Sequence, residues 1–172
     1  MDLRYPIGNF DYDAQHQFSD VASWVDDIRT LPSRISSAIQ TYSQEELDTT
    51  YRPGGWTTTQ VIHHLGDSHL NSLIRFKLAL TEKNPTIKPY DEQAWTSLGD
   101  YDALSIEDGL TLLELIHKKW VAVLDQMNEE DFNKTFFHPE SEIEYSLLQA
   151  TAMYAWHGNH HLGHIQLIKR NQ

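Results

Sequence analysis

The 172-residue sequence contains no cysteine. This absence excludes a disulfide framework, a nucleophilic or redox thiol, and every zinc site that uses thiolate ligands. A metal site in this chain must therefore use nitrogen and oxygen ligands. A chain of this length can bury about 70 % of the surface that its unfolded form exposes, so it needs no metal merely to fold. We expect one domain over residues 1–172, in which any bound ion serves function.

Long apolar runs and basic clusters are also missing. No stretch approaches the roughly 18 apolar residues of a membrane span, and the N-terminus lacks the charged start and apolar run of a signal peptide. We therefore expect a cytoplasmic protein without a membrane partner. Only 13 Lys and Arg stand against 25 Asp and Glu, which gives a net charge of -12. Because nucleic-acid binding needs a basic surface, we expect no nucleic-acid partner.

Apolar residues recur at three- and four-residue spacing in four segments, which predicts four amphipathic helices. The segments run from about Asp20 to Tyr42, from Thr57 to Lys83, from Ser105 to Met127 and from Ser146 to Arg170. Each helix has one apolar stripe to bury, so the sequence predicts an all-α four-helix bundle. Between the last two helices, Lys134–Tyr145 fits either a short β-hairpin or a plain loop.

Local sequence signals refine two of these helices. Thr57 with Gln60 has the spacing of a capping box, in which each side chain satisfies a backbone N–H at a helix start. Ser105 has an acid, Asp108, at the same spacing. Pro32 should kink the first helix, because it lacks a backbone N–H and clashes with the preceding turn.

Four of the ten histidines fall within eight residues of the last predicted helix: His157, His160, His161 and His164. At about 100° per residue they share one face of that helix. Two histidines four residues apart can place two nitrogens on one ion. The pairs His157/His161 and His160/His164 both have this spacing, so geometry alone leaves both open.

A third ligand must come from another helix. His64, in the middle of the second predicted helix, is the natural candidate, and His63, Asp67 and His69 are neighbours that could replace or support it. Three protein ligands leave a coordination position open, which is typical of a catalytic site. We expect the remaining histidines to be ordinary hydrogen-bonded residues: His16, His117 and His138.

The segments GGWTTTQVIHHLGDSHLNSLIRFKLALTE and HGNHHLGHI resemble the DinB/YfiT-like superfamily, in particular its YfiT branch. The resemblance implies a bundle of up-down-down-up topology, a three-histidine site for zinc or nickel, and often a homodimer. In the family pattern a Gly follows two residues after the second histidine of the pair, which selects His157 and His161. The liganding histidine of the second helix precedes a leucine, which selects His64.

The YfiT branch is described as metal-dependent hydrolases, so our leading hypothesis is an enzyme of that class that acts on a small molecule. Asp67 or His160 would orient a ligand or move a proton. A first alternative is a metal-dependent transferase that uses a low-molecular-weight thiol such as bacillithiol. A second alternative, from another class, is a metal-binding protein without catalysis.

Overall fold

The computed structural model describes residues 2–170, with side chains to residue 169. Four long helices dominate it: α1 (Val21–Ile39), α3 (Thr58–Thr81), α6 (Ile106–Leu124) and α8 (Leu147–Arg170). Each lies within one of the segments that the apolar spacing predicts. The predicted all-α bundle is therefore confirmed.

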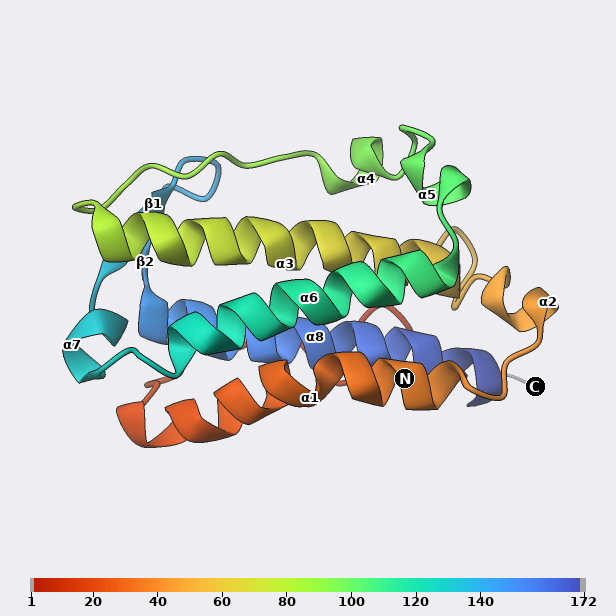
Figure 1. Ribbon diagram of the computed structural model, residues 1–172, viewed down its shortest axis with the longest axis horizontal. Helices are drawn as coiled ribbons and strands as arrows, with labels where there is room; N and C mark the ends of the chain where they lie inside the picture. Colours follow the sequence, from red (N-terminus) through yellow and green to blue (C-terminus); the bar gives the residue numbers. More distant parts are fainter. Residues whose placement is uncertain (1, 171–172) are drawn as a thin grey trace.

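The four helices form a closed ring with an unusual order of directions. Contacts join α1 to α8, α8 to α3, α3 to α6, and α6 back to α1. Along the bundle, α1 and α8 run one way and α3 and α6 run the other, which is the up-down-down-up topology (Figure 1). Because α3 and α6 are parallel, the chain must return along the bundle between them. This crossover carries the short helices α4 (Glu92–Trp95) and α5 (Asp100–Ala103).

Several short elements lie outside the four long helices. They are a 3-10 turn (Phe18–Asp20), α2 (Gln44–Leu47), α7 (Glu129–Phe132), β1 (Thr135–His138) and β2 (Ile143–Ser146). The two strands pair antiparallel, with Thr135 opposite Ser146. Of the two readings of this segment, the hairpin is correct. Helices of four residues were not predicted, because one turn is too short to show a helical period.

The start of α3 is fixed by the predicted capping box. The hydroxyl of Thr57 accepts from the backbone N–H of Gln60 at 3.1 Å, and the side-chain oxygen of Gln60 accepts from the N–H of Thr57 at 3.0 Å. Ser105 and Asp108 form the same arrangement at the start of α6. These caps satisfy donors that a helix cannot satisfy itself, and they thereby set where each helix begins.

The core divides into two apolar clusters with imidazoles between them. In one cluster Trp120 packs edge-on against Phe76, with ring centroids 5.4 Å apart. The other cluster contains Leu31, Ile35, Leu65 and Ile165, among others. The ring of His69 packs against Trp120 at 5.6 Å, and the ring of His64 packs against Trp56 beside the second cluster at 4.6 Å. The histidines thus belong to the interior of the bundle.

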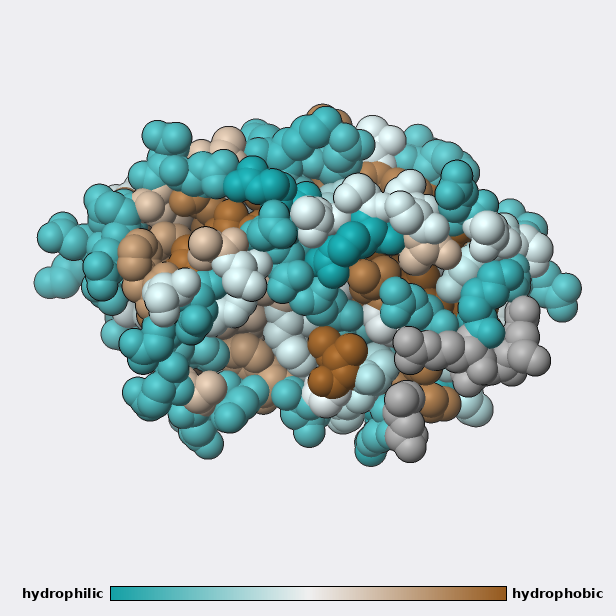
Figure 2. Space-filling view, turned by 90° about the horizontal axis from the view of Figure 1, so that it is seen from below, coloured by the Kyte–Doolittle hydropathy of each residue, from teal (hydrophilic) through white to brown (hydrophobic). Residues whose placement is uncertain are grey.

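The face seen from the α1 side is largely hydrophilic, with apolar side chains gathered mainly at the left of the view (Figure 2). Within the described residues, no helix is both long enough and apolar enough to cross a bilayer.

The close approach of α8 to α1 provides a test of the packing. A Cβ on Gly158 would lie 2.6 Å from Cδ2 of Leu31, which is buried in the core. We expect Gly158→Ala to lower the free energy of unfolding by about 1–2 kcal/mol, because overpacking outweighs the better helix propensity of alanine. Gly66→Ala is the control, since its Cβ would meet Leu112 at an ordinary 3.5 Å and should stabilise slightly. Urea unfolding measures both variants, and equal shifts would contradict the close packing.

Candidate metal centre

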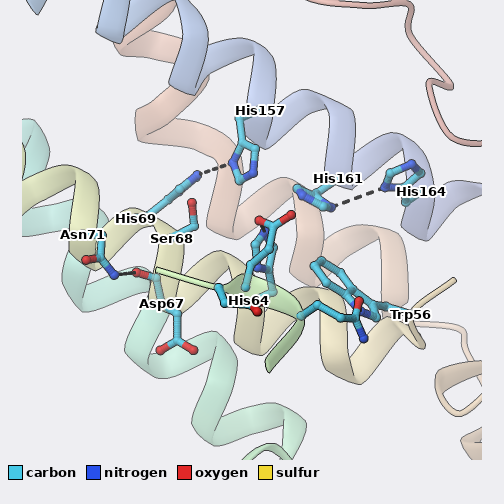
Figure 3. Close-up of polar contacts among 12 residues, drawn as sticks. Trp56, His64, Asp67, Ser68, His69, Asn71, His157, His161 and His164 are labelled. Atoms are coloured by element: carbon cyan, nitrogen blue, oxygen red, sulfur yellow. Dashed lines mark hydrogen bonds and ion pairs between the residues drawn. The ribbon is translucent and has the colours of Figure 1, made fainter. Parts of the chain in front are cut away.

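Two facing helices bring three predicted histidines together. His64 projects from the second turn of α3, and His157 and His161 project from successive turns of α8 (Figure 3). One nitrogen from each ring lies within 4.8 Å of one nitrogen from each of the others. The ring centroids of His157 and His161 are 4.6 Å apart, and that of His64 lies 4.8 Å from His161 and 5.6 Å from His157. We call these three residues the histidine triad.

Burial keeps the histidine triad uncharged. It lowers the pKa of His64 to about 4, with a smaller contribution from the nearby imidazoles of His160 and His164. Burial also holds the pKa of His157 and of His161 well below the ordinary value. Since water stabilises a cationic ring better than the core does, the rings are neutral at pH 7. A neutral imidazole has a free lone pair, which is the form that binds a metal ion.

An unpartnered atom shows that the triad suits a cation. The Nε2 atom of His64 is buried and has no hydrogen-bond partner among the described residues. An oxygen of Glu92, on α4, lies 3.9 Å from it. A buried polar atom without a partner costs about 1–3 kcal/mol. A divalent ion about 2.0–2.1 Å from that nitrogen would relieve this cost, so these residues fit such an ion.

The alternative histidines lie outside the triad. His63 projects toward α5, where its ring stacks on Tyr101 at 5.2 Å. His164 stacks on Tyr51 at 3.9 Å, and His160 stacks on Trp156 at 4.6 Å. Burial lowers the pKa of both His160 and His164 to about 4.

The structure does not bring Asp67 together with the triad. Asp67 follows His64 by three residues, which turns it about 60° around the helix. There its carboxylate accepts a 2.6 Å hydrogen bond from the hydroxyl of Tyr101, and burial raises its pKa. Figure 3 shows this carboxylate pointing away from the rings of α8. Asp67 therefore belongs to the contact between α3 and the crossover.

Two hollows open beside the triad, and they share His157 and Glu92. The first, of about 390 Å³, is lined among others by Arg52, Trp56, His160 and His161. The second, of about 520 Å³, is lined among others by Ser68, Arg75, Tyr90 and Tyr154. A small molecule in either hollow would reach the triad.

Sequence reasoning did not single out Glu92. It is one of 25 acids, and it lies in the crossover, where no periodic apolar pattern indicates a fixed position. Only Asp91, whose side chain accepts from the N–H of Ala94 at 2.9 Å, marks a local helix start there.

A four-helix bundle with three neutral imidazoles meeting in its interior belongs to the class of helical-bundle metalloproteins, which build their sites from facing helices. The model of the DinB superfamily matches residues 27–165, and the chain belongs to this superfamily. The predicted family is confirmed.

Individual relatives cover nearly the whole chain. A protein of Bacillus cereus (strain 03BB102), named "putative metal-dependent hydrolase", is 50% identical over 169 residues, which is 98% of this chain and 96% of the relative. A protein of Bacillus anthracis (strain A0248) with the same name is 49% identical over the same shares. The structure of YfiT from Bacillus subtilis matches with a TM-score of 0.94 and 38% identity, over 99% of this chain and 98% of that one. YfiT is described as "a probable metal-dependent hydrolase with an unusual four-helix bundle topology".

The buried imidazoles predict that the metal-free protein loses stability in acid. The unfolded chain binds a proton at each histidine below about pH 6.5, whereas folded His64 and His117 keep a pKa of about 4. Between about pH 6.5 and pH 4 the unfolded state binds more protons than the folded state. The free energy of unfolding is therefore highest above about pH 6.5, and it falls toward pH 4 by about 1.4 kcal/mol per pH unit for each ring. Urea unfolding at several pH values, with a chelator present, measures this. A midpoint that does not change with pH would contradict it.

Proposed function

We propose that this protein is a metal-dependent hydrolase that binds one divalent ion, zinc or nickel, per chain through His64, His157 and His161. The observation that carries the proposal is the convergence of three neutral imidazoles within 4.8 Å. Nitrogen ligands suit both metals. The hydrolase names of the relatives favour hydrolysis over thiol transfer.

The open side of the triad supports a catalytic rather than a storage role. When bound, the ion would polarise a substrate oxygen and bring the pKa of a water molecule to about 7. The chain provides the rest of the site. Trp56 packs its ring against His64 at 4.6 Å and lines the first hollow. His160, which lines the first hollow, remains our candidate for moving a proton.

We assign the role of general base to Glu92. Its carboxylate lies 3.9 Å from Nε2 of His64 and lines both hollows, so it can reach a water molecule beside the triad. The helix that carries Glu92 belongs to the crossover, and the side chain of Glu92 is 59% exposed. A general base needs such reach to both water and substrate.

Two arginines suggest that the substrate carries a negative charge. Arg52 lines the first hollow and Arg75 the second. The Nε atom of each is buried and lacks a hydrogen-bond partner among the described residues. Arg75 also donates to the hydroxyl of Tyr154 at 2.8 Å, which holds it in place. A carboxylate or phosphate group of a small substrate would satisfy these donors.

We also propose a single domain over residues 1–172, a cytoplasmic location and a homodimer. The homodimer is supported by apolar side chains that remain exposed on the neighbouring helices α3 and α6: Leu70, Ile74, Leu112 and Leu115. A second copy could cover this face.

Metal content tests the ligand set. We expect the purified protein to bind one zinc ion per chain, and His64→Ala or His157→Ala to lose most of that affinity, because each removes one of three ligands. His16→Gln is the control, since its ring stacks on Phe10 and is neither in the triad nor in the lining of either hollow. Zinc titration with elemental analysis measures this. Two or more tightly bound ions per chain would favour the non-catalytic alternative.

Glu92→Gln separates a general base from a metal ligand. We expect kcat for ester hydrolysis to fall about 10²–10⁴-fold, with zinc affinity nearly unchanged, because an amide cannot accept the proton. Glu107→Gln is the control, since Glu107 is exposed on α6. A matching loss of zinc affinity would instead make Glu92 a fourth ligand. Turnover only with an added low-molecular-weight thiol would favour the transferase alternative.

A further inference from the structure

Two buried histidines outside the triad form a chain that leads to one of its members. Nδ1 of His157 lies 3.1 Å from Nε2 of His69, and Nδ1 of His69 lies 2.7 Å from Nε2 of His117. His69 is fully buried and His117 is 2% exposed. Water therefore cannot satisfy these ring nitrogens, and each depends on the next ring.

This series of hydrogen bonds ends on a backbone carbonyl in α1. Nδ1 of His117 lies 2.6 Å from the carbonyl oxygen of Ile28. In a regular helix that carbonyl would accept from the N–H four residues later, but this position is Pro32, which has no N–H. The proline inside α1 therefore leaves the Ile28 carbonyl ready for an outside donor.

The carbonyl of Ile28 fixes the direction of every hydrogen bond in this series. A carbonyl oxygen can only accept, so Nδ1 of His117 carries a hydrogen and its Nε2 is an acceptor in the neutral ring. His69 must then donate from Nδ1 and accept at Nε2, and His157 must donate from Nδ1. His69 and His117 are enclosed in the core, and a neutral ring carries a single hydrogen, so each of these rings can donate only once.

We infer that His69 and His117 are positioning residues, which hold His157 in the Nδ1–H tautomer with its Nε2 lone pair directed to the ion. This inference rests on the proposed metal site. Ligating imidazoles usually donate their second N–H to an outer partner, and that partner fixes the ring. Here the outer partner of His157 is His69. The hydrogen bonds continue from His69 to His117 and to the carbonyl of Ile28, and we call this series of four residues the relay. It takes one residue from each of the four long helices.

The hydrogen bonds of His161, the other proposed ligand on α8, also lead to a backbone carbonyl. Nε2 of His164 lies 3.1 Å from the carbonyl oxygen of Arg4, so it donates, and its Nδ1 is an acceptor. Nδ1 of His161 lies 3.3 Å from Nδ1 of His164 and must donate to it. His161 therefore also keeps Nε2 for the ion, and His164, one of the two α8 histidines outside the triad, gains a role.

Ring tautomers in the metal-free protein test the relay directly. Long-range 15N–1H correlation spectra distinguish a ring with hydrogen on Nδ1 from one with hydrogen on Nε2. We expect the Nδ1–H form for His117, His69 and His157. The Nε2–H form at His69 or His157 would overturn the inference. Since no metal is present, this outcome does not depend on whether the protein is a hydrolase.

Zinc affinity tests the consequence for the site. We expect His69→Leu to weaken zinc binding about 10- to 100-fold, the usual effect of losing an outer partner. His69→Gln should recover part of this, because an amide still offers one donor and one acceptor. His16→Gln is the matched control. The cobalt-substituted protein should show a changed visible spectrum in His69→Leu, a signature that a merely structural role would leave unchanged.

Pro32→Ala tests the relay with every histidine in place. It restores a backbone N–H four residues after Ile28, which competes with His117 for the carbonyl. We expect zinc affinity to fall about two- to tenfold, the equivalent of one hydrogen bond. A folded Pro32→Ala protein with unchanged zinc affinity and unchanged ring tautomers would overturn the inference. Weaker zinc binding in these variants supports it whether or not any ester is hydrolysed.

Discussion

The arrangement of the site depends on one constraint, which is that its histidine rings are buried and uncharged. A neutral ring has one donor and one acceptor, and inside a core both need a partner. In this bundle the donors point outward along chains that end on backbone carbonyls of Ile28 and Arg4. The acceptors that remain point inward, toward the space beside His64. The same constraint therefore lowers the pKa values, fixes the rings and concentrates lone pairs at one place.

The topology adds the parts that helices alone cannot supply. Because α3 and α6 are parallel, a long crossover must return along the bundle (Figure 1), and it brings Glu92 of α4 to 3.9 Å from Nε2 of His64. Glu92 thereby reaches the triad from outside the core, with a side chain that is 59% exposed. The proposed histidine ligands come from two long helices, α3 and α8, whereas the carboxylate comes from the crossover. This division suits a site that must hold an ion firmly and still admit a substrate.

Sequence periodicity predicted the four helices, because long amphipathic segments repeat their signal several times, and local residue spacing predicted two capping boxes. It left the hairpin of residues 134–145 open, since two short strands repeat too little. The i,i+4 spacing fitted two pairs on α8 equally well, and only the family resemblance selected His157 and His161. The partners of the relay were out of reach: His117 looks like any core histidine, and its contact with Ile28 joins residues 89 positions apart. Asp67 was predicted near the triad because it is close to His64 in the sequence. It points about 60° away from His64 around the helix axis, however, and there it contacts Tyr101.

The most direct test of the account is a crystal structure of the zinc-loaded protein. The account predicts one ion bound by Nε2 of His64, His157 and His161 at about 2.0–2.1 Å, with at least one position left for water. An ion held by His160 and His164, an ion enclosed by four protein ligands, or a triad that binds neither zinc nor nickel would contradict it.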